Sequence, residues 1–185
     1  EIGAGLGEHI FHEKLSPLQR KNYVALELRE NMAEGIRSNH PDIQVWVGDC
    51  QEKIPAPNHE FDRIIASHVL EHLPNLPSAI KEIYRICHKK NGVFSVVIPC
   101  EGGFGYSIGR KVSVQRIFEK RYQQPYKWFI EREHVNIPQE ILEEILPYFK
   151  LESREFFPLK FFPYTWCNIS IGMNFRPKQH FELES

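Results

Sequence analysis

The sequence predicts a doubly wound α/β fold with a mostly parallel sheet and an antiparallel hairpin at its C-terminal edge. Short apolar runs of strand length alternate with helical stretches, which is typical of strand–helix–strand crossover units. The run VFSVVI at residues 93–98 is almost continuously apolar, as expected for a parallel strand covered on both faces. Near the C-terminus two strand-like runs follow each other without a helix between them, which favours a hairpin.

The first 100 residues contain four expected strands, each bounded by polar, Gly or Pro residues. They lie at residues 23–26, 43–47, 63–66 and 93–98. The clearest expected helix spans residues 77–87, with Pro77 suited to its first turn and Asn91-Gly92 following its end. Its apolar face consists of Leu76, Ile80, Ile83, Tyr84 and Cys87.

The pattern changes after Pro99. A glycine-rich stretch, EGGFGYSIG, leads into a basic amphipathic stretch and an aromatic loop, so residues 100–137 are interpreted as an insertion. A helix with the sequence QEILEEILPYF is expected after Pro138, and strands are expected near 151–156 and 169–175. The whole chain, residues 1–185, is predicted to form a single domain. Its N-terminus is expected to be truncated, because almost no strand precedes the opening EIGAGLG.

Composition and charge narrow the class of protein. The formal net charge of -1 argues against a globally basic protein that binds nucleic acid through its phosphates. The four cysteines have no paired spacing, so neither a zinc cluster nor a disulfide framework is indicated, and a cytoplasmic location is expected. No apolar run approaches the roughly 20 residues needed to cross a bilayer, so no membrane span is expected.

Three glycines open the chain in the pattern G-x-G-x-G. Gly3, Gly5 and Gly7 follow a strand end and precede an expected short helix near Glu8, so the backbone there can approach a ligand closely. The pattern alone is weak evidence for a particular ligand. It lacks the spacing G-x-G-x-x-G of a dinucleotide-binding loop and the Lys-Ser or Lys-Thr pair of a P-loop.

Two acidic residues follow the next two expected strands. Glu27 ends the strand that comes about 20 residues after the glycines, where a carboxylate can accept both ribose hydroxyls of a nucleoside. Asp49 follows the third strand, where it can accept from an adenine amino group while the Cys50 amide donates to the ring. The ordered set of glycine loop and two acids favours a nucleoside site over an ordinary turn with surface carboxylates.

Glu1 completes the pattern E-x-G-x-G-x-G, and with it the chain resembles the class I methyltransferases that use S-adenosylmethionine (SAM). The segment FDRIIASHVLEHL resembles the fourth-strand region of the methyltransferase type 11 group, and NGVFSVVIP resembles its fifth strand. The resemblance covers roughly residues 1–100 and implies a Rossmann-like sheet. SAM carries a sulfonium cation and no pyrophosphate, so the absence of a phosphate-binding motif is compatible with it.

The resemblance implies a role for each matching position. Glu1 would lie near the methionine moiety, and Gly3, Gly5 and Gly7 would form the cofactor loop. Glu27 would hold the ribose, while Asp49 and Cys50 would frame the adenine.

Five further positions concern the acceptor pocket or catalysis. Ser67 and His68 follow the fourth strand and would line the cofactor and acceptor pocket, with Ser67 on the cofactor. His68 and His134 are the candidate general bases, since an imidazole titrates near neutral pH. For His68 a pocket-lining role is the alternative. Glu71 and His72 are interpreted as packing and capping residues at a helix start rather than as catalysts.

Two surface features stand apart from this set. Residues 110–132 carry seven basic and only two acidic side chains, which indicates either a solvated helix face or an attraction for an anionic acceptor. The segment FFPLKFFPYTW at 156–166 is expected to pack mostly in the core or in a loop. A self-association or acceptor surface is the alternative there, so a homodimer is compatible with the sequence.

The expected activity is transfer of a methyl group from SAM to a small-molecule acceptor, with a hydroxyl of a sugar or other metabolite as first choice. This choice of acceptor rests on family analogy. Nucleic acid is not expected as the acceptor. The main alternative is a catalytically inactive SAM-binding domain with a regulatory or accessory role. A nucleotide-dependent oxidoreductase is disfavoured because the loop lacks the dinucleotide spacing.

Overall fold

The computed structural model describes residues 1–100, 135–162 and 164–179. The elements in chain order are α1 (Glu8–His12), α2 (Pro17–Lys21), β1 (Val24–Glu27), α3 (Glu30–Asn39), β2 (Gln44–Val47), β3 (Arg63–Ser67), the 3-10 turn η1 (Leu70–His72), α4 (Leu76–Ile86), β4 (Val93–Pro99), α8 (Pro138–Ile145), β5 (Phe149–Phe157), the 3-10 turn η3 (Thr165–Cys167) and β6 (Ser170–Pro177).

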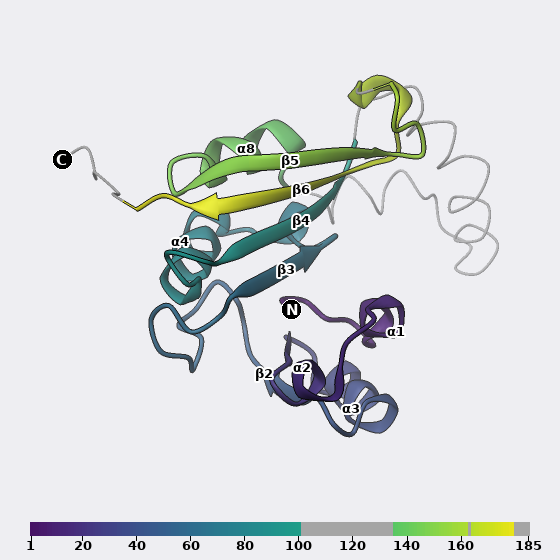
Figure 1. Ribbon diagram of the computed structural model, residues 1–185, viewed down its shortest axis with the longest axis vertical. Helices are drawn as coiled ribbons and strands as arrows, with labels where there is room; N and C mark the ends of the chain where they lie inside the picture. The colour runs from purple at the N-terminus through teal and green to yellow at the C-terminus, as the bar shows by residue number, and fades with distance from the viewer. Residues whose placement is uncertain (101–134, 163, 180–185) are drawn as a thin grey trace.

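The strands form one sheet whose two groups are joined by Ile2 (Figure 1). β1 pairs with β2 and β3 pairs with β4, both in parallel. Ile2 makes parallel bridges to Leu26 of β1 and to Ala66 of β3. β6 lies antiparallel between β4 and β5. The order β2, β1, Ile2, β3, β4, β6, β5 confirms the predicted mostly parallel sheet with an antiparallel C-terminal hairpin edge.

Helices cover both faces of this sheet because the chain adds strands on both sides of the central position of Ile2. α3 connects β1 to β2 on one side of Ile2, and α4 connects β3 to β4 on the other side. Right-handed crossovers in opposite directions place the two helices on opposite faces. Neighbouring residues of β1 divide accordingly, with Ala25 packed in the smaller cluster around Ile36 and Leu26 in the larger cluster around α4.

The amphipathic pattern of α4 explains its place in the larger core. The Asn75 side chain caps its first turn by accepting from the Ser78 amide, and Pro77 occupies that turn. Its buried residues are Leu76, Ala79, Ile80, Ile83 and Ile86. The predicted helix is therefore confirmed with small shifts at its ends, and Cys87 is its fully buried C-cap.

The aromatic segment between β5 and β6 forms a loop, one of the two placements expected from the sequence. Its large apolar side chains are mostly exposed, and that of Phe161 is 95% exposed. The loop is shaped instead by buried Asn168, whose amide donates to the carbonyls of Phe162 and Tyr164 and accepts from Leu159 N–H. Polar bonds to the backbone, rather than burial of rings, hold this loop, so most of the segment lies in a loop and not in the core.

No helix within the described ranges is long and apolar enough to span a bilayer.

The four thiols are expected to differ sharply in reactivity. Burial raises the pKa of Cys50 to about 12 and the pKa values of Cys87 and Cys100 to about 11. Cys167 is partly exposed. Because the thiolate is the reactive form, iodoacetamide at about pH 8 should label Cys167 first, and the other three should react only after unfolding. Peptide mass mapping over time measures this, and rapid labelling of Cys50, Cys87 or Cys100 in the folded protein would contradict the packing described.

Candidate functional site

The glycine loop turns sharply at the carboxyl edge of the sheet. Gly3, Gly5 and Gly7 have φ values of 62°, 60° and 80°, in the left-handed region that favours glycine. The loop is anchored to β1 because the Ala4 amide donates to the Leu26 carbonyl. Helix α1 begins at Glu8, as the sequence predicts.

Glu27, at the end of β1, lies against this loop although its side chain is only 5% exposed. Its Oε2 accepts from the Gly5 amide at 2.9 Å, and its Oε1 accepts from the Arg29 amide at 3.1 Å and from Arg29 Nε at 3.4 Å. A carboxylate offers about four lone-pair positions. The structure thus brings a buried carboxylate with remaining acceptor capacity into direct contact with the glycine loop.

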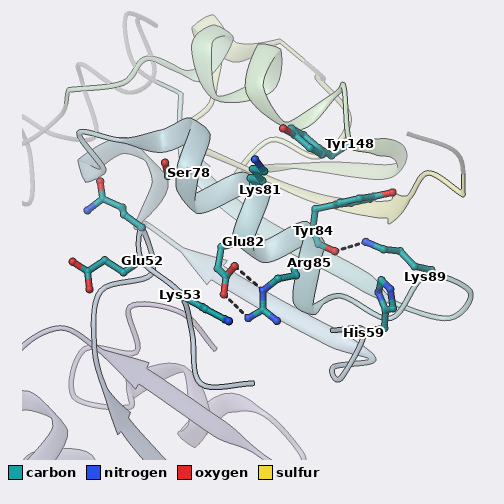
Figure 2. A pocket seen from close by; sticks show the side chains of 11 residues that line it. Glu52, Lys53, His59, Ser78, Lys81, Glu82, Tyr84, Arg85, Lys89 and Tyr148 are labelled. Atoms are coloured by element: carbon teal, nitrogen blue, oxygen red, sulfur yellow. Dashed lines mark hydrogen bonds and ion pairs between the residues drawn. The ribbon is translucent and has the colours of Figure 1, made fainter. Parts of the chain in front are cut away.

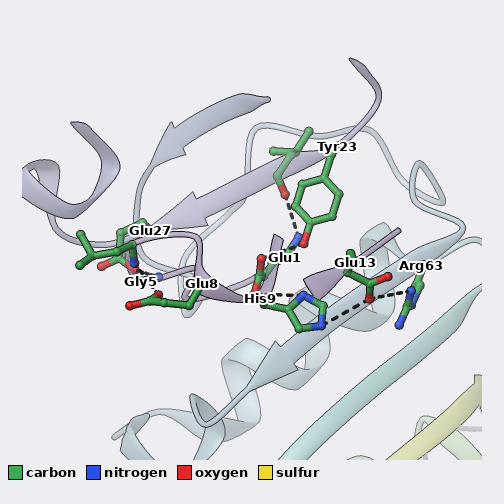
Figure 3. Close-up of polar contacts among 10 residues, drawn as sticks. Glu1, Gly5, Glu8, His9, Glu13, Tyr23, Glu27 and Arg63 are labelled. Carbon is green, nitrogen blue, oxygen red and sulfur yellow. Dashed lines mark hydrogen bonds and ion pairs between the residues drawn. The ribbon is translucent and has the colours of Figure 1, made fainter. Parts of the chain in front are cut away.

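Glu1 takes part in a separate polar cluster (Figure 3). Its Oε2 accepts from the Tyr23 hydroxyl at 2.7 Å, and its Oε1 lies 3.7 Å from His9 Nδ1. His9 Nε2 and Arg63 both approach Glu13 Oε1, at 3.4 and 3.1 Å. Burial, followed by the Glu1 carboxylate, raises the pKa of Tyr23. The polar partners of Glu1 are therefore Tyr23 and His9, and its place near a methionine moiety stays a prediction.

Asp49 and Cys50 follow β2, whose end lies beside that of β1 through a bond from the Gly48 amide to the Glu27 carbonyl. Asp49 accepts from the Gln51 amide at 2.9 Å and from Gln51 Nε2 at 3.0 Å on each oxygen. Gln51 Oε1 in turn accepts from the Asn75 amide. Gln51 therefore orients Asp49 and ties this turn to the start of α4, while Cys50 is buried.

Ser67, the last residue of β3, and His68, the next residue, lie in different environments. Ser67 lines a cavity of about 350 Å³ together with His9 and residues of β4, β5 and β6. His68 has a left-handed backbone with φ of 53°, and its side chain is 52% exposed. The next residue, Val69, packs on Gly3 so closely that a Cβ added to Gly3 would lie 2.5 Å from Val69 Cγ2. This contact joins the His68 turn to the glycine loop.

His134 lies outside the described residues, as do residues 101–133 of the expected insertion. The residues that flank this segment are held at known positions. Cys100 continues β4 by donating to the Ile169 carbonyl, and the amides of Val135 and Asn136 donate to the Glu71 carbonyl. Both flanks are therefore bonded to the backbone of the sheet or of the η1 turn.

A second, larger cavity of about 540 Å³ lies along α4 and contains none of the predicted site residues (Figure 2). Among its lining residues, Arg85 bonds both oxygens of Glu82 and the carbonyls of Ile54 and Ala56. Desolvation raises the pKa of the Glu82 carboxyl, but the Arg85 bond, the Ile54 amide and the charges of Arg85 and Lys53 together lower it below its ordinary value. The pair of Glu82 and Arg85 fastens the loop before β3 onto α4. In the described part of the chain no group of three metal-ligating side chains is present.

Several residues at the site escaped prediction. Tyr23 and His9 bond or approach Glu1, Gln51 orients Asp49, and Val69 packs on Gly3. These contacts join residues between 2 and 66 positions apart, and no local sequence motif indicates the contacts between distant residues. Glu71 belongs to the LEHL motif, from which the sequence predicts helix-start packing and capping.

The comparisons with known proteins agree on the fold. One similar structure is a SAM-dependent methyltransferase of Thermotoga maritima, a possible histamine N-methyltransferase, with 19% identity and a TM-score of 0.66, covering 96% of this chain and 80% of that one. A TehB-like SAM-dependent methyltransferase of Corynebacterium glutamicum has 16% identity and a TM-score of 0.64, covering 96% of this chain and 78% of that one. The PH0226 protein of Pyrococcus horikoshii has 16% identity and a TM-score of 0.64, covering 96% and 80%. No curated protein matches the sequence significantly.

The family follows from the sequence match rather than from these distant structures. The model of the methyltransferase domain family matches residues 1–96, which is more than half of the chain. The matched region contains the glycine loop, the ends of β1 and β2 and the His68 turn. The chain therefore belongs to the methyltransferase domain family and is a class I, SAM-dependent methyltransferase.

Proposed function

We propose that the chain methylates a small-molecule acceptor at the carboxyl edge of its sheet, where ligands bind in doubly wound folds. The observation that carries this proposal is the buried Glu27 carboxylate held against the glycine loop. Three donors occupy it, Gly5 N–H, Arg29 N–H and Arg29 Nε, so about one of its four acceptor positions is left for a ribose hydroxyl. The residues present therefore fit a nucleoside cofactor.

Each cofactor-binding residue has a physical task in this proposal. The backbone can pass close to the cofactor at Gly3, Gly5 and Gly7, because glycine has no side chain. Their positive φ values would strain any other residue. Asp49, oriented by Gln51, would accept from the adenine amino group, and the Cys50 amide would donate to the ring. Glu1 and Ser67 are assigned to the cofactor by their place in the family motif alone.

When bound, SAM would supply an activated methyl group on its sulfonium sulfur. The protein's own contribution is to hold the acceptor atom in line with the methyl–sulfur bond and to exclude water, so most of the rate gain comes from positioning. His68, half exposed beside the glycine loop, is assigned as the general base. His134 is the second candidate base from the sequence.

The acceptor is proposed to be a small metabolite with a hydroxyl group, and an amine is the second candidate. The amine is favoured by the similar structure described as a possible histamine N-methyltransferase. Residues 100–137 are proposed as the acceptor-side segment, because Val135 and Asn136 bond the turn that follows His68. We further infer that residues 1–185 act as one domain in the cytoplasm, a location compatible with four free cysteines. The exposed rings of the β5–β6 loop are compatible with a homodimer.

Calorimetric titration with SAM and with S-adenosylhomocysteine, using NAD as a control, tests the cofactor assignment. We expect micromolar binding of the first two and none of NAD, since the loop lacks the spacing of a pyrophosphate site. A screen of hydroxyl and amine acceptors with radiolabelled SAM then follows. Binding without turnover on any acceptor would favour the inactive SAM-binding alternative, and no SAM binding by a folded sample would overturn the proposal.

A further inference from the structure

The carboxylate of Glu71 is unusually placed for a charged group. The residue is 1% exposed, within the η1 turn that directly follows the His68 strand end. Its Oε2 is buried and has no hydrogen-bond partner. Acidic side chains are almost never fully buried unless they are paired, because burial strips away their water. A carboxylate kept in this position needs a reason beyond packing.

The one hydrogen-bonding partner of this carboxylate within the described residues is His68, whose Nδ1 lies 3.3 Å from Glu71 Oε1. The two side chains differ in exposure, at 52% for His68 and 2% for Glu71. The two ring nitrogens point in nearly opposite directions, so His68 Nε2 points away from the buried carboxylate and toward the exposed side. The imidazole thus spans from the core to the surface at the carboxyl edge of the sheet.

The turn that carries this pair is held from several sides. The His68 amide donates to the Val97 carbonyl, and Val69 packs on Gly3. The Asn136 side chain donates to the carbonyls of Leu70 and Leu73 at 2.8 and 2.7 Å. These bonds, made by backbone and amide groups, fix the turn without using the Glu71 carboxylate. The carboxylate is therefore free to act on His68 alone.

We propose that Glu71 is a positioning residue that keeps the proton of neutral His68 on Nδ1 and leaves Nε2 as the proton acceptor. A carboxylate bonded to one imidazole nitrogen fixes the tautomer and stabilises the imidazolium that forms when the other nitrogen takes a proton. This inference rests on the proposed function, in which His68 is the base. When the acceptor atom bonds the methyl carbon, the electron pair of the breaking carbon–sulfur bond goes to sulfur. The acceptor's proton passes to His68 Nε2, and the new positive charge lies beside Glu71.

The test is ¹⁵N NMR of the histidine rings at about pH 8, where an ordinary histidine is mostly neutral. His68→Gln identifies the His68 signals, and His72→Gln in the same turn is the matched control. In the unmodified chain we expect His68 mainly as the tautomer with its proton on Nδ1. Glu71→Gln should shift the ratio of the two tautomers roughly tenfold toward Nε2–H, because a bond to a charged group is worth about one factor of ten.

The NMR results test the role of Glu71 independently of the methyltransferase activity. His68 carrying its proton on Nε2 in the unmodified chain would overturn the proposal, and this measurement stands even if Glu71→Gln does not fold. A folded Glu71→Gln with an unchanged tautomer ratio would overturn it as well. Because the spectra need neither cofactor nor acceptor, failure of the SAM titration would count against the proposed function and leave this result intact.

Discussion

Replacing Gly3 by alanine is expected to lower the free energy of unfolding by about 2–4 kcal/mol. Two costs combine in this value, the strain of a left-handed alanine and the overpacking of a tight contact, each roughly 1–2 kcal/mol. Gly3 has φ of 62°, and its added Cβ would lie 2.5 and 3.0 Å from the two methyl carbons of Val69. Valine cannot swing aside easily, because its branched Cβ restricts χ1. Urea unfolding followed by circular dichroism measures the change.

Two further variants separate the causes of that loss. In a Val69→Ala background the same change at Gly3 should cost less, because the contact is relieved while the backbone strain remains. Gly48→Ala is the matched control, since its Cβ would meet only Leu26 Cδ1 at an ordinary 3.6 Å. We expect it to alter the free energy of unfolding by no more than about 0.5 kcal/mol. Equal effects at Gly3 and Gly48 would refute the close approach of the His68 turn to the glycine loop.

Replacing Glu27 by alanine should weaken SAM binding by about 1–3 kcal/mol, the cost of leaving buried polar partners unpaired. The dissociation constant would rise roughly 5- to 150-fold. The same change removes the acceptor of the Gly5 amide at 2.9 Å, so the loop should also lose its anchor. Calorimetric titration measures the affinity at a temperature where circular dichroism shows the variant folded.

The control for this variant is Glu30→Ala, three residues further along the chain. Glu30 is exposed at the start of α3 and pairs with Arg37, away from the glycine loop contacts. Its removal should leave SAM affinity unchanged, because exposed ion pairs contribute little. A folded Glu27→Ala with unchanged SAM affinity would show that the ribose is held elsewhere.

Local patterns account for the parts of the fold that the sequence predicted well. The four expected strands of the first half appear within one or two residues of β1, β2, β3 and β4, because each is a short apolar run with clear polar borders. One missed element, α2, was also encoded locally. Ser16 and Gln19 form a capping box around Pro17, a signature that could have been recognised.

The aromatic segment and Glu71 show what such local patterns leave undecided. Rings are usually buried, yet those of Phe161, Phe162 and Trp166 extend from the β5–β6 loop, because Asn168 satisfies the loop's backbone without them. Glu71 is buried, as a packing residue would be, but its carboxylate pairs with His68 and caps no helix. Both results depend on which residues cover a position, and composition does not specify that.

The sequence by itself determined the α/β class, the parallel strands, the hairpin edge and the order of glycine loop and acidic strand ends, since these depend on residues close together in the chain. Tertiary structure alone decided which groups far apart in the chain meet and which of them are buried. The bond from Gly5 to Glu27 spans 22 residues, and that from Asn136 to Leu70 spans 66. Burial and pairing arise only when distant segments pack and exclude water, so His68 acquires its buried carboxylate partner only in the folded chain.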